Sequence, residues 1–512
     1  MKPILIIPEE VFLVIKSFQE NNFEAYIVGG CVRDILRDIK PEDWDIATNA
    51  KPEEIGKLFL RSYSDNKFGT VKVLIPKKQL PITDDFKKEK EFIEIEITPF
   101  RIEEKYTDKR HPDRIKWAKT IEEDLKRRDF TINAMAIEID IKSQISNLKK
   151  GLEYKIIDPF NGRKDLRDQI IRAVGSPEER FSEDALRLMR AIRFAVCLGP
   201  KIWQIEEKTG KAIKKNAHFL QFISKERIRD ELLKIIDSVN GARGIELLRR
   251  YQLLFYIISE LEEGFRIEQN KHHIYQVYQH NLLSLNYACQ RNLSQIVKLA
   301  ALFHDIAKPR TKQGEGQDAT FYNHEVIGTE MSYQILKRLK FSRKEIEKIV
   351  KLVRYHLFYY NVGEVGESSV RRLLRKVGEE DIYRLLELRQ ADRVGSGLPK
   401  AEPYKLRYLK YLFEKVSQDP ISPKMLEVNG YDVMRILKIS SSPKIGRILS
   451  CLLAKVLTNP KKNERKFLEK EIKDLEKLSD EELKKLFQKA EEEIEKIETK
   501  RDEMTKSKYW IT

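Results

Sequence analysis

The sequence predicts an α+β fold in which a head of short strands and helices precedes a long, all-helical body. Up to about residue 147, short apolar stretches typical of strands alternate with helical segments. From about residue 165 the apolar residues recur with a helical period, as in Ala185–Phe194. From residue 461 to residue 508 the chain is nearly all Lys, Glu, Asp and Leu, which predicts an exposed helical tail or a short helical hairpin.

The elements of the head are expected in the following order. A helix over Pro8–Glu20 has its apolar residues on one face and leads to an apolar strand at Ala25–Val28. Gly29-Gly30 ends this strand, and a helix starts at Cys31. Three further strands are expected at Asp43–Ala47, Thr70–Ile75 and Glu91–Thr98, and the segment 130–139 is expected to be helical or mixed.

The composition limits the classes of function. The 512 residues include 97 Lys and Arg against 81 Asp and Glu, a net charge of +16. This surplus favours a polyanionic partner, although a Lys- and Glu-rich surface is also typical of thermophilic proteins. We expect no membrane span and no signal peptide, because no apolar run is long enough. The four cysteines, Cys31, Cys197, Cys289 and Cys451, form no CxxC pair, which favours a reducing, cytoplasmic location.

The strongest local signal is the Gly29-Gly30 turn followed by Asp43-Trp44-Asp45. Two glycines between a strand and a helix let the main chain approach an anion, and a triphosphate is the natural candidate. If Asp43 and Asp45 lie in a strand, their carboxylates point to one face and repel each other. A pair of Mg²⁺ ions relieves this repulsion and supplies a site for phosphoryl transfer. The alternative is a solvated turn that carries two acids.

A two-metal site needs a third carboxylate. The next apolar strand offers Glu94 and Glu96 on one face. We predict Glu96 as the third acid, since it begins the segment Glu96–Arg101. The alternative is that an edge strand carries alternating Glu residues for solubility.

A polar cluster follows at Arg127-Arg128-Asp129, with Asn133 four residues after Asp129. The arginines suit phosphate groups, whereas Asp129 and Asn133 suit ribose hydroxyls. An ordinary helix cap explains the same composition.

A second polar cluster repeats every three residues along one helical face, at Asp184, Arg187, Arg190 and Arg193. A carboxylate accepts from an exocyclic amine and a guanidinium donates to ring acceptors, so this face could read the Watson–Crick edge of C or A without a template. The alternative is an intrahelical ladder of salt bridges.

The motifs GGxxRD, DxD, RRDFTINA and RFxEDxLRxxRxxRF, in this order and spacing, closely resemble those of bacterial class II tRNA nucleotidyltransferases. This is the CCA-adding group, which is related to bacterial poly(A) polymerases. The resemblance covers about residues 20–235, including Ser224–Leu232. It implies a polymerase-β-like nucleotidyltransferase head that is a small mixed sheet with helices. It also implies Mg²⁺ ions on Asp43 and Asp45, with CTP, ATP and the acceptor end and T arm of tRNA as partners.

The same resemblance implies roles for further residues. Gly29, Gly30 and Arg33 would contact the triphosphate; Arg128, Asp129 and Asn133 the phosphate and sugar; Asp184 and Arg187 would act as an amino-acid template, supported by Arg190 and Arg193. The segment Phe68–Val71 looks like the CCA-adding version of its strand. The stretch Arg101–Thr120 resembles the flexible loop that matters for switching from C to A addition.

Most of the eight histidines fall in the second half of the chain, in an H…HD…H…H…D order. The residues are His280, His304, Asp305, His324, His356 and Asp392. Imidazoles with carboxylates suit Mn, Fe, Ni or Zn, and the extra histidines allow two metals. The set resembles the HD phosphohydrolase domain, which implies a divalent transition metal there. His272 and His273 are expected to be structural, His111 to belong to the flexible loop, and His218 has no evident role.

We therefore expect a head at residues 1–147, a neck at 148–235 for base recognition and RNA binding, an HD-type domain at 236–400 and a body with a charged tail at 401–512. The expected function is template-independent addition of C, C and A to the tRNA 3′ end. Addition of CC alone, with a separate A-adding enzyme as partner, stays open, and so does poly(A) polymerase activity. A dedicated HD phosphohydrolase and a non-catalytic RNA-binding protein are weaker alternatives.

Overall fold

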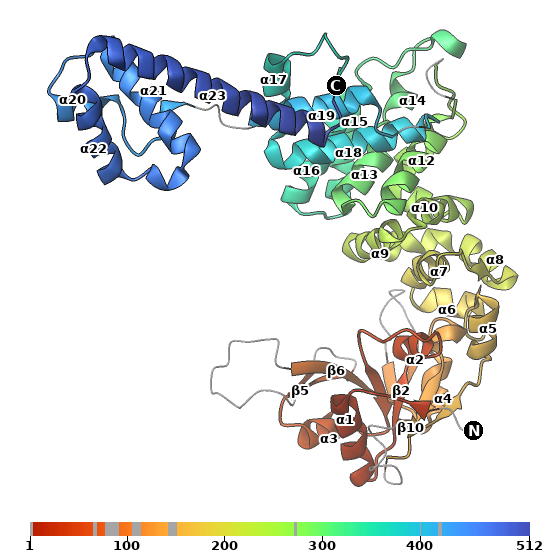
Figure 1. Ribbon diagram of the computed structural model, residues 1–512. Coiled ribbons are helices and arrows are strands. Elements are labelled where there is room, and N and C mark those ends of the chain that lie inside the picture. The colour runs from red at the N-terminus through yellow and green to blue at the C-terminus, as the bar shows by residue number, and fades with distance from the viewer. Residues whose placement is uncertain are drawn as a thin grey trace. The chain divides into compact units, whose positions relative to one another are not determined.

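A seven-stranded mixed sheet forms the centre of the head (Figure 1). In spatial order its strands are β11 (Lys155–Ile157), β9 (Ala136–Glu138), β2 (Ala25–Val28), β3 (Asp45–Thr48), β6 (Phe92–Pro99), β5 (Val71–Pro76) and β4 (Ser62–Ser64). The β3–β6 pair is parallel, and the other five pairs are antiparallel. Because β11 pairs with β9, the sheet of the head continues beyond residue 147.

The structure is a computed structural model that describes residues 4–64, 69–76, 92–104, 114–141, 151–270, 274–399, 401–417 and 422–511. It divides into two compact units. One unit comprises Met1–His356 and Glu387–Leu398, and the other comprises Leu357–Leu386 and Pro399–Thr512. None of the described helices is both long and apolar enough to cross a membrane.

The two faces of the sheet differ because side chains alternate along each strand. Ile46 and Ile97 point into a core that also contains the apolar face of α1 (Glu9–Glu20) and α3 (Pro52–Leu58). Ala47 contributes to a smaller core on the opposite face, together with α4 (Ile121–Lys126). The alternation therefore places Asp45 on the face that lies away from α1.

Three two-stranded sheets flank the main sheet. They pair β1 (Ile4–Leu5) with β10 (Leu152–Glu153), β7 (Arg101–Glu104) with β8 (Arg114–Trp117), and β12 (Ile170–Ile171) with β13 (Gln204–Ile205). The remaining head elements are α2 (Gly30–Ile35) and the 3₁₀ helix η2 (Thr131–Asn133). The segment 130–139 is thus mixed, as expected, since η2 precedes strand β9.

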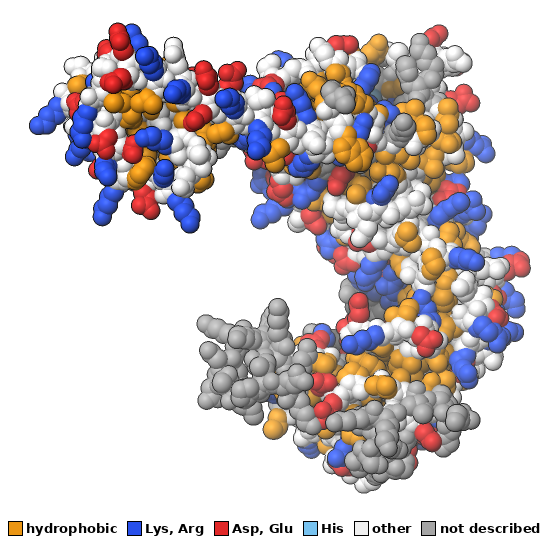
Figure 2. Space-filling view, in the orientation of Figure 1, with side chains coloured by type: hydrophobic (Ala, Val, Ile, Leu, Met, Phe, Trp, Pro, Cys, Tyr) orange, Lys and Arg blue, Asp and Glu red, His pale blue; other side chains and the backbone are white. Residues whose placement is uncertain are grey.

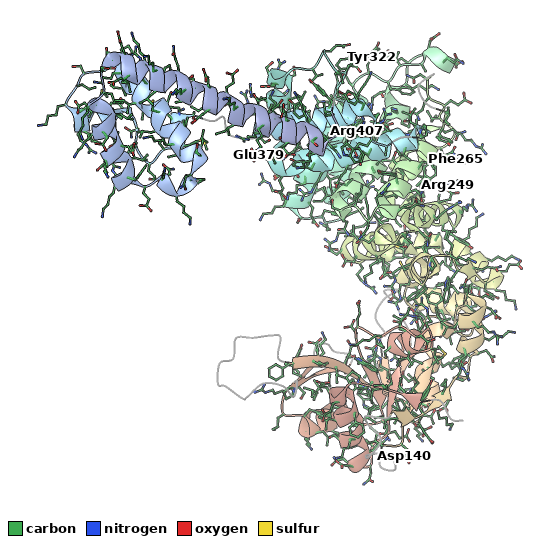
Figure 3. All side chains as sticks on the ribbon, viewed as in Figure 1. Asp140, Arg249, Phe265, Tyr322, Glu379 and Arg407 are labelled. Atoms are coloured by element: carbon green, nitrogen blue, oxygen red, sulfur yellow. The ribbon has the colours of Figure 1, made fainter. Side chains whose placement is uncertain are left out.

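Helices build the rest of the first unit, as the periodicity predicts. They are α5 (Gly162–Asp168), α6 (Pro177–Glu183), α7 (Leu186–Cys197), α8 (Glu207–Lys215), α9 (Lys225–Asp237), α10 (Gly241–Arg250), α11 (Leu254–Glu262), α12 (Val277–Gln290), α13 (Gln295–Phe303), α14 (Lys308–Thr311), α15 (His324–Arg338) and α16 (Arg343–Tyr355), with 3₁₀ helices η4 (Ala217–Phe222) and η5 (Gly316–Asp318). Arg249 of α10 lies over the ring of Phe265, 4.1 Å from its centroid (Figure 3). This contact joins α10 to the segment after α11.

The second unit is helical in its described parts. Its helices are α17 (Glu367–Val377), the first part of α18 (Glu379–Gly395), α19 (Tyr404–Ser417), α20 (Gly430–Leu437), α21 (Pro443–Thr458), α22 (Arg465–Glu476) and α23 (Asp480–Lys508), with 3₁₀ helices η6 (Pro423–Met425) and η7 (Pro460–Lys462). The α+β fold class with a helical body is confirmed.

The charged C-terminal segment forms two helices, α22 and α23, and it is not wholly exposed. Leu475 and Leu483 are buried in a core with Leu452 of α21, whereas Leu486 is 40% exposed. Figure 2 shows basic and acidic side chains interspersed over the visible face of α20–α23. The alternative of an exposed tail is therefore wrong for the apolar face, because Leu residues pack one side of each helix into the core. The other alternative, a helical hairpin, requires two successive helices, which α22 and α23 provide.

Candidate functional site

The turn between β2 and α2 requires glycine. Gly29 has a φ of +79°, which L side chains rarely adopt. A Cβ atom here would lie 2.9 Å from Nη1 of Arg128 and 3.3 Å from Oδ2 of Asp45. The absence of a side chain therefore lets a guanidinium and a carboxylate approach the main chain at the start of α2.

The two acids after this turn have different surroundings. Strand β3 begins at Asp45, so Asp43 precedes the strand, and the expected strand start at residue 43 was two residues too early. Asp43 is exposed, whereas Asp45 is half-buried. Burial raises the pKa of the Asp45 carboxyl, Arg128 opposes this rise and the charge of Asp43 adds to it. The two carboxylates thus act on each other electrostatically although only one lies in the strand.

The parallel register of β3 and β6 pairs Asp45 with Glu96. Paired residues on neighbouring strands point to the same face, so Glu96 lies on the face that carries Asp45. Glu94 accepts a hydrogen bond from the Tyr63 hydroxyl at 2.7 Å and pairs with Lys72 at 2.9 Å, and these contacts lower its pKa. Glu94 is therefore engaged by Tyr63 and Lys72, and Glu96 stays the prediction for the third acid.

Arginines from two segments meet beside the Gly29 turn. Arg127 and Arg128 pair with the buried Asp124 of α4, at 2.8 and 3.2 Å. Arg33 of α2 donates from Nη1 to Oδ1 of Asn133 at 2.9 Å. These contacts orient the guanidinium groups before any ligand is present, which lowers the entropy lost when an anion binds.

Asp129 is buried and connects the head to α7 through hydrogen bonds. Its carboxylate accepts hydrogen bonds from Nδ2 of Asn133 at 3.1 Å and from Nε of Arg190 at 2.7 Å. Burial alone would raise the pKa of Asp129, but the charges of Arg190 and Arg187 outweigh burial and lower the pKa to about 2. Asp129 therefore stays ionised throughout the neutral range.

The polar face of α7 is tied to other segments more than to itself. The pairs are Asp184 with Arg227 at 3.0 Å, Arg190 with Asp129 at 2.5 Å, Arg193 with Glu231 at 3.2 Å and Arg187 with Glu183 at 2.5 Å. Even the last pair joins two helices, because Glu183 ends α6 and Arg187 lies in α7. An intrahelical ladder, the alternative interpretation, therefore does not describe this face.

A cavity of about 1140 Å³ brings the predicted residues of the head and neck together. The sequence-predicted residues that line it are Gly29, Gly30, Arg33, Asp43, Asp45, Arg128, Asp129, Asn133, Asp184, Arg187, Arg190 and Arg193. Glu96 is not part of this lining. Residues from β2–β3, from the segment before η2 and from α7 thus face one space, although their individual roles remain predictions.

Sequence reasoning gave no role to Arg227 and Glu231 of α9, although both hold side chains that line the cavity. Their spacing of four residues is the signal that could have found them, since such residues share one helical face.

A sequence model of a protein family, described as "Poly A polymerase head domain", matches residues 25–172. Residues 25–172 are therefore similar to poly(A) polymerase head domains. Behind this head, a model described as "Probable RNA and SrmB- binding site of polymerase A" matches residues 203–265. A third, described as "tRNA nucleotidyltransferase domain 2 putative", matches residues 321–472.

Curated relatives with the same head are CCA-adding enzymes. The chain is 40% identical over 266 residues to that of Lactobacillus helveticus, which is 52% of this chain and 57% of the relative. It is 43% identical over 257 residues to that of Enterococcus faecalis, 50% of this chain and 56% of the relative. The chain therefore spans little more than half the length of the curated relatives it matches.

Solved structures extend the likeness beyond the head. The CCA-adding enzyme of Bacillus stearothermophilus, solved in complex with CTP, superposes with a TM-score of 0.56 at 26% identity, over 91% of this chain and 96% of that one. An apo form of a CCA-adding enzyme gives a TM-score of 0.51 at 22% identity, over 91% and 96%. The resemblance to CCA-adding enzymes expected from the motifs is confirmed.

The acids of the head domain should affect stability with opposite signs. The raised pKa of Asp45 means that its ionised form destabilises the fold above that pKa, and the penalty disappears as pH falls below the ordinary value. The pKa of about 2 for Asp129 means that its charge stabilises the fold by about 2 kcal/mol until pH falls through 2. Asp45→Asn should therefore raise the melting temperature at pH 7 but not at pH 4.

The matched variant is Asp129→Asn, which should lower the melting temperature at both pH values. Thermal denaturation followed by circular dichroism measures both. A loss of stability in Asp45→Asn at pH 7 contradicts the assignment of Asp45 as a half-buried carboxylate whose charge destabilises the fold.

Outside the head domain, four imidazoles and two carboxylates converge in the first unit. His280 comes from α12, His304 and Asp305 follow α13, His324 begins α15 and His356 follows α16. Two groups, His280–His304–Asp305 and Asp305–His324–His356, each offer ligand atoms that lie within 4.8 Å of one another. Asp305 belongs to both groups.

Main-chain carbonyl groups fix the orientation of three of these rings. Nδ1 of His304 lies 2.9 Å from the carbonyl oxygen of Ala301, and His324 and His356 make the same contact with the residue three positions earlier, at 2.6 and 2.7 Å. A neutral ring that donates from Nδ1 keeps the lone pair of Nε2 for a metal. Nε2 of His324 and Nε2 of His356 are buried and lie 3.2 and 3.6 Å from Oδ1 of Asp305.

The last ligand candidate, Asp392, reaches the cluster through a close helix approach. A Cβ atom on Gly395 would lie 2.1 Å from Oγ of Ser284 and 3.0 Å from the carbonyl oxygen of His280. Glycine at this position lets α18 lie against α12, and Oδ1 of Asp392 is then 3.3 Å from Nε2 of His280. The six residues expected from the H…HD…H…H…D order are thus assembled.

The pKa values of His280 and His304 shift in opposite directions, although the two rings are in contact. Nε2 of His280 lies 2.9 Å from Nε2 of His304. Burial lowers the pKa of both rings, to about 3 for His304, but hydrogen bonds to Asp305 and Asp392 prevail at His280 and raise its pKa to about 9. The donor set therefore attracts positive charge, which fits a metal cation.

Some expectations fall outside the described residues. These are Phe68, the segment 105–113 of the expected flexible loop with His111, and the pair His272 and His273. His218 is exposed on η4, 4.4 Å from the ring of Phe219.

Proposed function

We propose that this chain is a template-independent nucleotidyltransferase that adds C, C and A to the 3′ end of tRNA, with release of pyrophosphate. The observation that carries the proposal is the single cavity that joins the acids beside β3 to the polar face of α7. A triphosphate site and a base-reading face in one space are what a polymerase without a template needs. The similarity to CCA-adding enzymes supports the choice of tRNA.

The reaction forms one phosphorus–oxygen bond and breaks another. The 3′-hydroxyl oxygen attacks the α-phosphorus of CTP or ATP as its proton passes to solvent, the bond from the α-phosphorus to the oxygen that bridges to the β-phosphate breaks, and pyrophosphate leaves. Asp43 and Asp45 would hold Mg²⁺, with Glu96 as the third acid. The fit rests on the electrostatic repulsion between Asp43 and Asp45, which a cation relieves. Bound Mg²⁺ supplies charge neutralisation at the phosphates and a more acidic hydroxyl.

The remaining residues position the nucleotide. Gly29 and Gly30 leave room for the triphosphate beside the guanidinium groups of Arg33 and Arg128. Asp129 and Asn133 would accept and donate hydrogen bonds at the ribose.

The α7 face would choose the base. Asp184 accepts from the amino group that C and A share, and Arg187 donates to a ring acceptor. Arg190 and Arg193 hold the face in place through Asp129 and Glu231. The net charge of +16 suits an RNA whose phosphates are held through the acceptor end and the T arm.

The test is extension of a tRNA transcript that ends at the discriminator base, resolved to single nucleotides, with Mg²⁺ and CTP, ATP or both. We expect growth by two with CTP and by one more with ATP. Growth by two that stops, with no A added to a substrate ending in CC, would instead assign CC addition and a separate A-adding partner. Long ATP-driven products on ends other than tRNA would assign a poly(A) polymerase.

We also propose a second, metal-dependent function for the histidine cluster, namely phosphohydrolysis of the HD type. The specific observation is that two groups of ligand atoms share Asp305. Each group would hold one divalent transition metal, through His280 and His304 or through His324 and His356. Such metals, when bound, polarise a phosphoryl oxygen and acidify water. Lys308, whose Nζ lies 2.6 Å from Oδ2 of Asp305, balances the charge of that carboxylate.

A further inference from the structure

We infer that Arg227 of α9 is a positioning residue for base selection, because it holds the carboxylate of Asp184 in one orientation at the edge of the cavity. This inference rests on the proposed function of that cavity. It concerns a residue that does not line the cavity and that acts only through Asp184.

Arg227 and Asp184 form a bidentate ion pair. Nη1 donates to Oδ1 of Asp184 at 3.4 Å, and Nη2 donates to Oδ2 at 3.0 Å. The N–H of Leu186 donates to Oδ1 as well, at 3.1 Å. A carboxylate held by three donors on the protein side cannot rotate freely, and its remaining lone pairs have a fixed direction.

Arg227 lies on α9, which packs along α7 (Figure 1). Ile228, Leu232 and Ile235 bury the apolar face of α9 and fix its rotation. Arg227 and Glu231 lie one turn apart on this helix. Glu231, which is 4% exposed, pairs with Arg193 at 3.2 Å.

The charges of α9 therefore complement those of α7 at both ends of the polar face. Arg227 of α9 holds Asp184, which lies just before α7, and Glu231 of α9 holds Arg193 of α7. Neither Arg227 nor Glu231 needs to touch a nucleotide to influence which base fits.

The chemistry explains why orientation decides selectivity. The amino groups of C and A donate, whereas U and G present a carbonyl oxygen at the corresponding position. A fixed carboxylate faces such an oxygen with an acceptor and repels it. A carboxylate free to turn away loses the bond to the amine and, with it, the penalty against the wrong base.

The experiment measures single-nucleotide extension of the tRNA transcript by wild type, Arg227→Gln and Arg227→Lys with CTP and with UTP, and compares the ratio of kcat/KM values. We expect the CTP preference of Arg227→Gln to fall about tenfold, the size of a loosened hydrogen-bond pair. Arg227→Lys, which keeps the charge but not the fork, should be intermediate. The tRNA Kd should stay within about twofold.

The matched control is Arg229→Gln, two residues further along α9. Arg229 pairs with Asp230 and with the carbonyl of Lys340, away from the cavity. This variant should keep the wild-type ratio. If Arg227→Gln does not fold, Arg227→Lys provides the measurement, since it also removes the fork that holds Asp184.

The outcomes distinguish failure of the positioning role of Arg227 from failure of the proposed function. An unchanged CTP preference in Arg227→Gln or Arg227→Lys overturns the positioning role, even if kcat falls. Failure of the wild type to extend tRNA overturns the proposed function instead.

Discussion

Replacement of Asp43 by Ala is expected to lower nucleotide incorporation at least about a thousandfold, since a lost metal site removes several kcal/mol of transition-state stabilisation. Asp43 is exposed, lines the cavity and lies outside strand β3. Its loss should therefore leave the fold and tRNA binding nearly intact. Extension assays at saturating CTP, with tRNA binding measured by filter retention, separate the two effects.

The matched control for Asp43→Ala is Glu53→Ala, which removes an exposed carboxylate from α3 of the same head. It should incorporate CTP at the wild-type rate. If Asp43→Ala keeps activity within tenfold of wild type, Asp43 is not a metal ligand. If it loses activity together with tRNA binding, its role is structural.

Replacement of Asp305 by Asn is expected to abolish transition-metal binding by the histidine cluster. Asp305 is shared by both ligand groups and is 2% exposed. The wild-type chain, stripped with chelator and dialysed against Mn²⁺ or Zn²⁺, should retain metal. At a hundredfold excess over Kd, bound metal should also stabilise the fold by about 2.7 kcal/mol. Elemental analysis and thermal denaturation measure the two effects.

Asp318→Asn, which changes an exposed acid on η5, serves as the control and should bind metal as wild type does. His356→Gln provides an independent variant that keeps a polar side chain of similar size. Metal retention by Asp305→Asn at the wild-type stoichiometry would falsify the cluster as the binding site. Addition of C to tRNA should be unaffected in both cluster variants, since neither residue lines the head cavity.

Much of the head could be predicted from the sequence because its signals are local. The apolar run at Ala25–Val28 is strand β2, and the first of the two glycines after it, Gly29, has a left-handed backbone conformation that disfavours other residues. The turn after β2 and Asp45 line the same cavity because β2 runs antiparallel to β3, which places the end of β2 beside the start of β3.

The remainder depends on tertiary contacts that no local pattern encodes. The start of β3 at Asp45 is set by pairing with β2 and β6, not by the Asp43–Asp45 segment itself. The arginines of α7 look like a ladder in sequence, yet their partners come from α9 and from the segment before η2. The ion pairs Arg190–Asp129 and Arg193–Glu231 join residues that are 61 and 38 positions apart, which spacing alone does not reveal.

The histidine cluster shows the same division. The order of its ligands is visible in the sequence, whereas the approach of α18 that delivers Asp392 depends on Gly395. The sequence alone does not indicate the role of Gly395. Its importance follows from its contacts with Ser284 and His280, both more than one hundred residues earlier.

The hydrogen bonds from ring to main chain in this cluster bear on which cation it would accept under the proposed metal binding. His304, His324 and His356 can neither rotate nor move back without breaking a bond to a carbonyl group. The span between their Nε2 atoms is therefore set by the helices. An ion whose preferred bond lengths match that span would be fully ligated, whereas a smaller ion of equal charge would leave rings out of reach. If the cluster binds metal as proposed, we expect it to discriminate among divalent ions by radius.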